Sequence, residues 1–401
     1  MGAMQCDYYD AHRCRSCALM GVPYAVQLGD KQQHCAAVLS EVAPAVTWLP
    51  AVESAPSGFR NKAKLVVGGA PGAVTLGILD PAGRGVDLRY CGLYEPGLHE
   101  LVPRLADLVD DLRLEPYDVP SRRGELKHLI VTRSPAGEVM LRFVLRSQKH
   151  LALLRSRLVV IAERLPEVVV VSVNLQPEHK AVLEGETEIV LTEAAVLPMQ
   201  VNGITLTLRP NSFFQTNTEV AAALYRQAQQ WISSTRPARV LDLYCGVGGF
   251  AMHAALLGED GPAEVVGIEV SPEAVASAEH TAGELRASTG GLAPVSFRVG
   301  DATDVAALGS LGAGSLVVVN PPRRGIGPAL AAWIEQSGAA QVIYSSCNVE
   351  SLARDIAGLP SFSAVAARLF DMFPQTGHRE VMVLLERADA ELPTAATDLA
   401  P

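Results

Sequence analysis

The chain has 401 residues, 49% of them hydrophobic, and a formal net charge of −10 at pH 7. This composition excludes an intrinsically disordered chain, and the acidic balance argues against nucleic-acid binding as a property of the whole surface. No apolar run reaches the ~18 residues of a membrane span and no secretory signal is visible, so we expect a soluble, cytoplasmic protein of two or three domains.

Residues 1–95 are rich in cysteine, glycine and proline, with one strand-like run at Ala63–Gly68 and no long helical pattern. A tight Cys-x2-Cys pair with two outlying cysteines is typical of an iron–sulfur site, whereas zinc sites more often carry two such pairs. Zinc and unligated thiols remain alternatives from the spacing alone. The candidate ligands are Cys6, Cys14, Cys17 and Cys91.

Residues 96–200 form a central α+β segment in which a helical stretch, Leu98–Leu112, precedes a β-rich block. Alternating residues predict four strands, the first two joined as a hairpin: His128–Arg133, Val139–Ser147, Val168–Leu175 and Thr187–Thr192. Between Ser121 and His150 there are seven Lys or Arg against two Glu. The simplest interpretation is a solvated sheet face, but such a segment is also a natural site for an RNA backbone.

Residues 201–388 change in character. Asn202-Gly203 marks a hairpin, a helix is predicted at Thr218–Ile232, and strands then alternate with Ala- and Leu-rich helices, which predicts a doubly wound parallel sheet. The strands are Arg239–Leu243, Glu264–Glu269, Val295–Val299, Leu316–Asn320, Gln341–Ser345, Ala364–Phe370 and Val381–Glu386. The last two lack a connecting helix and should pair antiparallel at one edge, the usual seven-stranded methyltransferase architecture. We expect residues 389–401 to be disordered.

A glycine-rich segment, Asp242-Leu-Tyr-Cys-Gly-Val-Gly-Gly-Phe250, follows the first of these strands and opens a helix, the context in which such loops bind nucleoside cofactors. Glu269 ends the next strand, where a carboxylate can accept hydrogen bonds from both ribose hydroxyls. A nicotinamide dinucleotide also fits this pattern. The acidic residue just before the loop favours a cationic, amino-acid-bearing cofactor, S-adenosylmethionine.

Three further motifs follow strand ends: Asn320-Pro-Pro-Arg323, Ser345-Ser-Cys347-Asn348 and His378-Arg-Glu380. Asn-Pro-Pro by itself is typical of amino methyltransferases, and a lone Cys347 is most simply a buried thiol. Together with Glu380 the thiol suggests another chemistry, because uracil C5 becomes nucleophilic only after a thiolate adds to C6. A base must then remove the C5 proton.

The chain resembles the bacterial RNA uracil-C5 methyltransferases, and among them the 23S rRNA enzymes that carry an N-terminal [4Fe-4S] cluster. The matching stretches are Met4–Cys17, Gly58–Lys64, Arg122–Lys127, Leu141–Arg146, Arg209–Asn217, Asn320–Gly327 and Phe370–Pro374. The resemblance spans residues 4–386 and implies a class I methyltransferase domain. It also implies 5-methyluridine formation in 23S rRNA, with the uridine at position 747 as the expected target.

The resemblance also implies roles for individual residues. The four N-terminal cysteines would hold the cluster, Cys347 would be the nucleophile, Glu380 the base, and Phe213 would stack on the target base. The cofactor candidates are Gln215, Tyr244, Gly246, Glu269, Asp301 and Asn320. Independently of the resemblance, basic residues of two Lys- and Arg-rich stretches are further candidate RNA contacts beside Phe213: Arg60, Lys62, Arg122, Arg123, Lys127 and Arg142.

One position departs from the family pattern, since Gln375 stands where the relatives usually have histidine, which puts an accessory proton role in doubt. The alternatives are the same chemistry on another rRNA or tRNA uridine, an Asn-Pro-Pro amino methyltransferase, and a non-catalytic RNA-binding module. The amino-methyltransferase alternative leaves Cys347 and Glu380 unexplained, and the tRNA branch typically lacks the cysteines. No obligate protein partner is evident.

Overall fold

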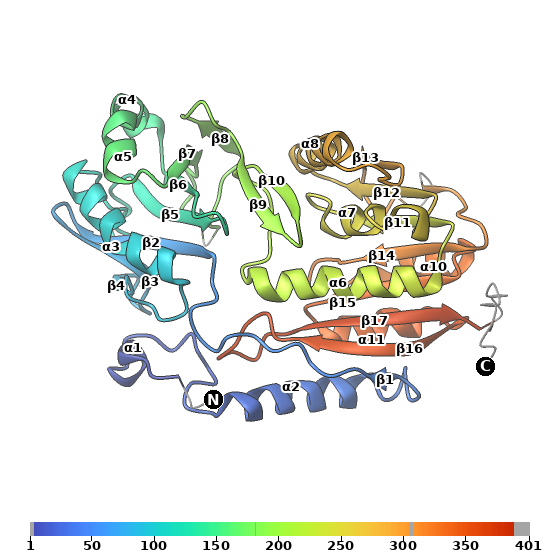
Figure 1. The fold of residues 1–401 in the computed structure, drawn as a ribbon. Helices are drawn as coiled ribbons and strands as arrows, with labels where there is room; N and C mark the ends of the chain where they lie inside the picture. The colour runs from blue at the N-terminus through green and yellow to red at the C-terminus, as the bar shows by residue number, and fades with distance from the viewer. Residues whose placement is uncertain (1–3, 181, 305–307, 389–401) are drawn as a thin grey trace, which may run out of the picture. The chain divides into compact units, whose positions relative to one another are not determined.

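The computed structural model describes residues 4–180, 182–304 and 308–388 and divides the chain into two compact units (Figure 1). Unit 1 contains Met1–Gly29, Glu53–Ala222 and Met372–His378, and unit 2 contains Asp30–Val52, Ala223–Asp371 and Arg379–Pro401. These units do not follow the predicted boundaries at residues 95 and 200. The predicted disordered tail lies outside the described residues.

Unit 1 is built on a seven-stranded sheet of order β4-β3-β2-β5-β6-β7-β8. Its strands are β2 (Lys62–Ala70), β3 (Ala73–Leu79), β4 (Gly85–Asp87), β5 (Leu126–Arg133), β6 (Val139–Leu145), β7 (Val168–Leu175) and β8 (Thr187–Val190). All neighbours pair antiparallel except β6 and β7, which are parallel. Because β2 pairs with β5, residues on both sides of the predicted boundary at 95 share one sheet.

The core of unit 1 lies between one face of this sheet and its helices. Helix α3 (Pro96–Asp111) contributes a stripe of leucines that includes Leu98, Leu101 and Leu105, and these pack with alternate strand residues such as Leu129 and Phe143. Helices α4 (Leu151–Ser156) and α5 (Leu158–Arg164) add Leu154 and Ile161 to the same core. The intervening strand residues therefore point to the opposite face.

Two smaller parts complete unit 1. Helix α1 (Asp7–Asp10) lies among the N-terminal cysteines. Strands β9 (Leu197–Val201) and β10 (Ile204–Leu208) form the predicted hairpin, and both turn residues, Asn202 and Gly203, have positive φ of 52° and 81°. Left-handed backbone at both positions is what a tight hairpin with an Asn-Gly turn requires.

Unit 2 contains an eight-stranded sheet of order β1-β16-β17-β15-β14-β11-β12-β13. Its strands are β1 (Thr47–Trp48), β11 (Arg239–Leu243), β12 (Glu264–Glu269), β13 (Val295–Val299), β14 (Ser315–Val319), β15 (Gln341–Ser346), β16 (Phe362–Phe370) and β17 (Glu380–Arg387). The seven predicted strands are confirmed, and β16 and β17 pair antiparallel as expected. The eighth strand, β1, was not predicted, because two residues are too short for a periodic signal; it pairs parallel with β16.

Helices connect the parallel strands of unit 2. They are α7 (Gly249–Ala255), α8 (Pro272–Ser288), α10 (Gly327–Gln336) and α11 (Val349–Ala357), and α6 (Thr218–Thr235) precedes β11. Every residue of β14 is buried, as expected for a central parallel strand covered on both faces. No helix in the described parts of the chain is long and apolar enough to span a membrane.

The expectation that residues 1–95 hold no long helix was wrong, because α2 (Tyr24–Leu39) has 16 residues. Its buried stripe includes Gln27 and Lys31, which interrupt the apolar pattern. The Gln27 side chain exchanges hydrogen bonds with the main chain and side chain of Gln375, and Lys31 Nζ lies 2.7 Å from Asp371 Oδ1. A helix is predicted from a periodic stripe of apolar residues. In α2, polar residues with partners on distant segments occupy part of that stripe.

Candidate active site

The parallel strands of unit 2 bring most of the predicted site residues to one edge of the sheet. Strands β11, β12, β13, β14 and β15 run parallel, so their carboxyl ends share this edge. β17 is antiparallel to β15, with Ser346 opposite Val381, which puts the start of β17 at the same edge. The residues there are Tyr244, Glu269, Asp301, Asn320, Cys347 and Glu380. Ligands of open α/β sheets bind at this edge.

Cys347 and Glu380 lie at neighbouring strand ends. Cys347 follows β15 and is half-buried, and Glu380 begins β17 and is buried. Burial raises the pKa of the Cys347 thiol, and the nearby Glu380 carboxylate raises it further, whereas the Arg323 guanidinium and its hydrogen bond lower it. The Asn-Pro-Pro-Arg motif therefore contributes a cation beside the thiol that can stabilise its thiolate.

Glu380 has an acidity unusual for a carboxyl group. Complete burial raises its pKa to about 7, and a hydrogen bond donated by the Ser345 hydroxyl partly opposes this shift. A carboxyl group poised near neutral pH is suited to accept a proton during catalysis. Sequence reasoning assigned no role to Ser345; the available signal was its place two residues before the candidate nucleophile in the Ser345-Ser-Cys347 motif.

Glu269 is held by the backbone around it. Its Oε2 accepts the Gly246 N–H at 3.1 Å, and its Oε1 accepts the Ser271 N–H at 3.0 Å. Each carboxylate oxygen keeps a further lone pair for a ribose hydroxyl. Gly246 has a φ of 54°, and a Cβ there would meet no atom within 4 Å, so this part of the loop borders open space. The loop and carboxylate fit a nucleoside cofactor.

Asp242 differs from Glu269 in being completely buried. One of its oxygens, Oδ2, accepts the Ala251 N–H at 3.0 Å, but Oδ1 has no hydrogen-bond partner among the described residues. Burial raises the Asp242 pKa to about 8, and the charge of Glu269 adds to the shift. Tyr244, two residues later, adopts a φ of 61°, a strained conformation that is concentrated at functional sites. With its pKa raised to about 8, the Asp242 carboxyl group is mainly protonated at neutral pH, and its buried Oδ1 lies below the surface of the site.

The remaining cofactor candidates have different surroundings. Asn320 is half-buried directly after β14, whereas Asp301 is exposed, and its Oδ1 accepts hydrogen bonds from the Thr303 N–H and hydroxyl at 2.8 and 2.7 Å. Gln215 belongs to unit 1, where its backbone carbonyl accepts a hydrogen bond from Asn61 at 3.0 Å. Phe213, also in unit 1, is 70% exposed, so its ring is open to a stacking partner.

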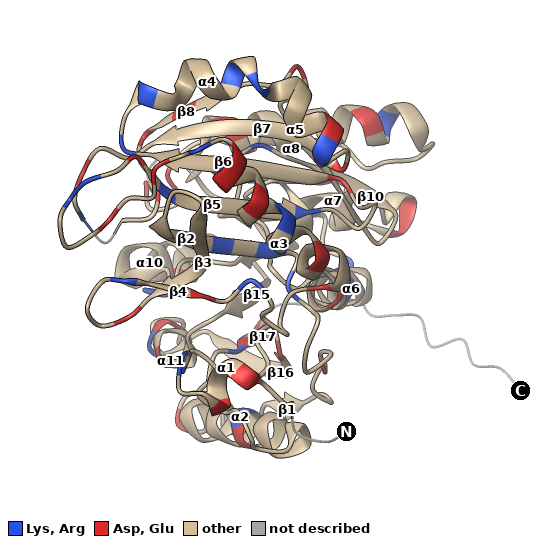
Figure 2. Ribbon diagram, turned by 90° about the vertical axis from the view of Figure 1, so that its left-hand side faces the viewer, with Lys and Arg blue, Asp and Glu red and all other residues tan. Residues whose placement is uncertain are grey.

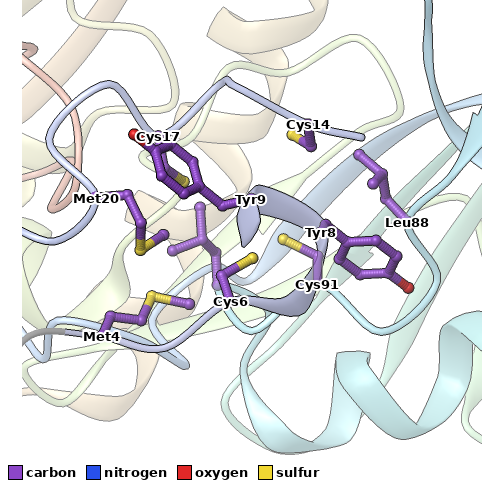
Figure 3. A pocket seen from close by; sticks show the side chains of 10 residues that line it. Met4, Cys6, Tyr8, Tyr9, Cys14, Cys17, Met20, Leu88 and Cys91 are labelled. Atoms are coloured by element: carbon purple, nitrogen blue, oxygen red, sulfur yellow. The ribbon is translucent and has the colours of Figure 1, made fainter. Parts of the chain in front are cut away.

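The four N-terminal cysteines share one small cavity of unit 1, which Met4, Tyr9 and Met20 also line (Figure 3). Burial and the neighbouring Cys91, Cys14 and Cys6 raise the pKa of Cys17 to about 12. In the described part of the chain, no group of three or more His, Cys, Asp or Glu is arranged to hold a single metal ion. Four cysteines around one apolar cavity nevertheless have the donor types that an iron–sulfur cluster requires.

The predicted RNA contacts fall into two groups. Arg122 and Arg123 are exposed and Arg60 and Lys62 half-buried, whereas Arg142 and Lys127 are buried. Arg142 is held by Glu184, Glu188 and Asn211, which stabilises the sheet face of unit 1. We therefore remove Arg142 from the RNA contacts, because its charge is neutralised inside the protein. Basic and acidic residues are interspersed along the ribbon (Figure 2).

Gln375, the departure from the family pattern, has a structural role. It is buried with a φ of 67°, and its side-chain amide donates a hydrogen bond to the Pro56 carbonyl at 3.0 Å. With the two bonds to Gln27 described above, it joins three segments of unit 1. This network uses both the carbonyl and the amine of the Gln375 side chain, a set of bonds that needs no titratable group.

Two family models match the C-terminal part of the chain, "Methyltransferase domain" at residues 234–310 and "tRNA (Uracil-5-)-methyltransferase" at residues 307–388. Proteins named 23S rRNA (uracil(747)-C(5))-methyltransferase RlmC are similar over nearly their whole length. The protein from Halothiobacillus neapolitanus is 45% identical, over 96% of this chain and 100% of its own. The protein from Edwardsiella ictaluri is 46% identical over the same shares.

A solved structure shows the same fold. It is the crystal structure of Pyrococcus abyssi tRNA (uracil-54, C5)-methyltransferase in complex with S-adenosyl-L-homocysteine. The match has a TM-score of 0.75 at 23% identity and covers 92% of this chain and 85% of that one.

Proposed function

The chain belongs to the RlmC family of 23S rRNA (uracil(747)-C(5))-methyltransferases, and we propose that Cys347 and Glu380 perform its chemistry at the sheet edge of unit 2. The predicted class I methyltransferase fold is confirmed. The reaction is S-adenosylmethionine-dependent methylation of uracil C5 in 23S rRNA. The uridine at position 747 is the proposed target. The observation that carries the proposal is a thiol and a buried carboxyl group of raised pKa at adjacent strand ends.

The proposed reaction begins with the Cys347 thiolate. It adds to uracil C6, and the C5=C6 electron pair moves into an enolate that makes C5 nucleophilic. S-adenosylmethionine supplies an electrophilic methyl group, which C5 takes up. Glu380 then accepts the C5 proton, the C–H electron pair re-forms the C5=C6 bond, and the Cys347 thiolate leaves. The products are 5-methyluridine, S-adenosylhomocysteine and the regenerated thiolate, with one proton transferred to Glu380.

The protonation states of the two groups support this division of roles. With its pKa near 7, Glu380 is partly ionised at neutral pH and is a stronger base than an exposed carboxylate. The Cys347 thiol is mainly protonated in the free protein, because burial and Glu380 raise its pKa. Arg323 opposes that shift, so we assign it the role of stabilising the attacking thiolate.

We assign the cofactor to the loop after β11. Glu269, fixed by two backbone N–H groups, would accept the ribose hydroxyls, and Gly246 leaves room beside them. Asp242 is completely buried, and burial raises its pKa to about 8, so we assign it a structural role: its Oδ2 holds the Ala251 N–H in the first turn of α7. Tyr244, Asp301, Asn320 and Gln215 remain proposed contacts.

We propose that the four cysteines around the N-terminal cavity hold a [4Fe-4S] cluster with a structural role. The cavity joins the α1 segment to Cys91, which follows strand β4 of the unit 1 sheet. A cluster would link these two segments covalently through its iron–thiolate bonds. Cys14→Ser is expected to remove the visible absorbance of the cluster and to lower the thermal stability of unit 1. Unchanged absorbance in this variant would exclude Cys14 as a ligand.

The test of the proposed function is methyl transfer from labelled S-adenosylmethionine to unmodified 23S rRNA and tRNA transcripts, with product nucleosides identified by mass spectrometry. We expect one 5-methyluridine in 23S rRNA. Cys347→Ala should abolish it, while Cys35→Ala, which removes a buried thiol of the same unit, should retain it. Methylated tRNA would reassign the substrate, and methylated adenine would contradict the assigned chemistry.

A further inference from the structure

Unit 1 contains a cavity of about 290 Å³ that the proposed reaction does not use. Val66 of β2 and His128 of β5 line it and are direct partners in the sheet. Their neighbours Leu65 and Leu129 pack in the core with α3, so Val66 and His128 lie on the opposite face. This volume is near the lower end of small-molecule sites.

The walls of the cavity combine apolar surface with a cation. Leu79 and Val119 add apolar surface to that of Val66. Lys127 Nζ donates hydrogen bonds to the Gln176 side chain and to the Glu178 carbonyl and lies 4.8 Å from the centre of the Tyr117 ring. These two acceptors account for two of the three donors of the ammonium group.

Burial lowers the pKa of the Lys127 ammonium group, whereas two carboxylates, Glu125 and Glu178, raise it, and Glu125 is paired with Arg146 at 2.9 Å. The Glu178 carboxylate, the acidic group in the lining, lies 2.8 Å from Lys180 Nζ, which offsets its charge. The Tyr117 hydroxyl is 2.9 Å from His179 Nδ1. The cavity therefore presents an aromatic ring, polar groups and an ammonium group between apolar walls.

His128 contributes a neutral polar group. Burial lowers its pKa to about 4, and the charge of Lys127 adds to the effect, so the imidazole is uncharged at neutral pH. Its Nδ1 is buried without a hydrogen-bond partner in the described part of the chain. Because Nδ1 itself has no accessible surface, His128 contributes an uncharged ring to the wall of the cavity, and its Nδ1 is not a contact for a ligand.

The loop beside the cavity carries two exposed cations. Val119 lines the cavity, and the same loop contains Arg122 and Arg123, both exposed. A backbone hydrogen bond of 2.8 Å from the Asp118 N–H to the Arg123 carbonyl closes the loop. Arg122–Lys127 is also one of the stretches that carry the family resemblance. An apolar slot with a hydrogen-bond donor, bordered by arginines, is complementary to a base and its flanking phosphates.

We propose that this cavity is a second base-binding subsite, which takes an unpaired nucleobase of the substrate RNA other than the methylated uracil. The base enters between the apolar walls, Lys127 donates to a carbonyl oxygen of uracil or guanine, and Arg122 and Arg123 meet the adjoining phosphates. Single-stranded RNA is recognised in this way, by bases splayed out of the helix. The inference rests on the proposed function, since it requires RNA as the substrate, and it assigns part of the RNA specificity to unit 1.

The experiment combines a tryptophan substitution that fills the cavity with RNA substrates that each lack one base. Val119→Trp is compared with Val159→Trp, which adds the same side chain at a position of unit 1 that is 69% exposed and outside the cavity lining. Each full-length variant is assayed with the intact RNA loop and with versions carrying one abasic nucleotide. We expect Val119→Trp to raise the KM for intact RNA about tenfold or more, the scale of one lost base contact. At one abasic position, the KM of wild type should rise by the same factor relative to intact RNA. The KM of Val119→Trp should be the same for that abasic RNA and for intact RNA.

A second variant tests the subsite without a tryptophan that could distort the loop. Lys127→Met removes the donor with similar side-chain length and should abolish the preference for a carbonyl-bearing base at the same position. Equal KM values for Val119→Trp and Val159→Trp would overturn the subsite. The subsite would also be overturned if the ratio of the KM of Val119→Trp to that of wild type were the same for intact RNA and for every abasic RNA. Absence of 5-methyluridine with wild-type protein would instead refute the proposed function.

Discussion

Replacing Glu380 by glutamine should stabilise the protein while stopping its catalytic cycle. The raised pKa means that folded protein holds the Glu380 proton more tightly than unfolded protein does. The stability that this provides is present below the unfolded pKa and is lost as pH rises through about 7. A shift from 4.5 to about 7 corresponds to about 3 kcal/mol, because one pKa unit is about 1.4 kcal/mol. Glutamine carries no charge at any of these pH values, so the variant keeps the free energy of unfolding that wild type loses as the pH rises.

The assay compares urea unfolding of wild type and Glu380→Gln at pH 5 and pH 8.5. Relative to wild type, the variant should gain about 2–3 kcal/mol of unfolding free energy between the two pH values. Glu386→Gln is the matched control, because Glu386 lies near the other end of the same strand and is half-buried. In the same preparations, Glu380→Gln should accumulate a covalent RNA adduct through Cys347, since the C5 proton is no longer removed.

Two results would contradict this reasoning. If the stability difference between Glu380→Gln and wild type is the same at both pH values, the carboxyl group does not titrate with a raised pKa. If the variant releases 5-methyluridine at the wild-type rate without an adduct, Glu380 is not the base. If Glu386→Gln showed an equal change in unfolding free energy between the two pH values, the pH dependence would not come from the buried Glu380 carboxyl group.

Three further predictions concern the same site. Cys347→Ala should abolish both methyl transfer and the RNA adduct yet bind S-adenosylmethionine with wild-type affinity, as measured by calorimetry; loss of cofactor binding would instead indicate a structural role. Ser345→Ala removes the hydrogen bond that lowers the pKa of Glu380, so the acidic limb of the pH–rate profile should move to higher pH, and an unmoved limb would show that another group controls it. Glu269→Ala should weaken S-adenosylmethionine binding by about tenfold or more, since hydrogen bonds to a charged group contribute about 1.5–3 kcal/mol, and an unchanged dissociation constant would exclude it as a ribose ligand.

The strands of unit 2 could be predicted from sequence with small errors. Arg239–Leu243, Glu264–Glu269 and Val295–Val299 were predicted with the bounds that the structure shows. Short apolar runs alternating with helices carry this information locally, because a central parallel strand must be apolar on both faces. The same runs end close to Cys347 and Glu380, which is why the sequence alone was enough to propose these two residues as the nucleophile and the base.

Features that depend on distant partners were not predictable in this way. Helix α2 was missed because Gln27 and Lys31 occupy its buried stripe, and only Gln375 and Asp371 make that burial favourable. Arg142 was assigned to RNA because it lies in a basic segment, yet Glu184 and Glu188 neutralise it inside unit 1. A cation in a sequence has no visible partner when that partner is about forty residues away.

The sequence by itself determined the order of the elements, the residue types of the site and the chemistry that a thiol with a carboxyl base can perform. Only the tertiary structure decided the acidity of Glu380, the orphaned oxygen of Asp242 and the contact between Ser345 and the proposed base. The reason is physical: strand propensity and motif spacing act over a few residues. Burial and electrostatic surroundings, by contrast, arise when the pairing of β15 with β17 brings distant segments together.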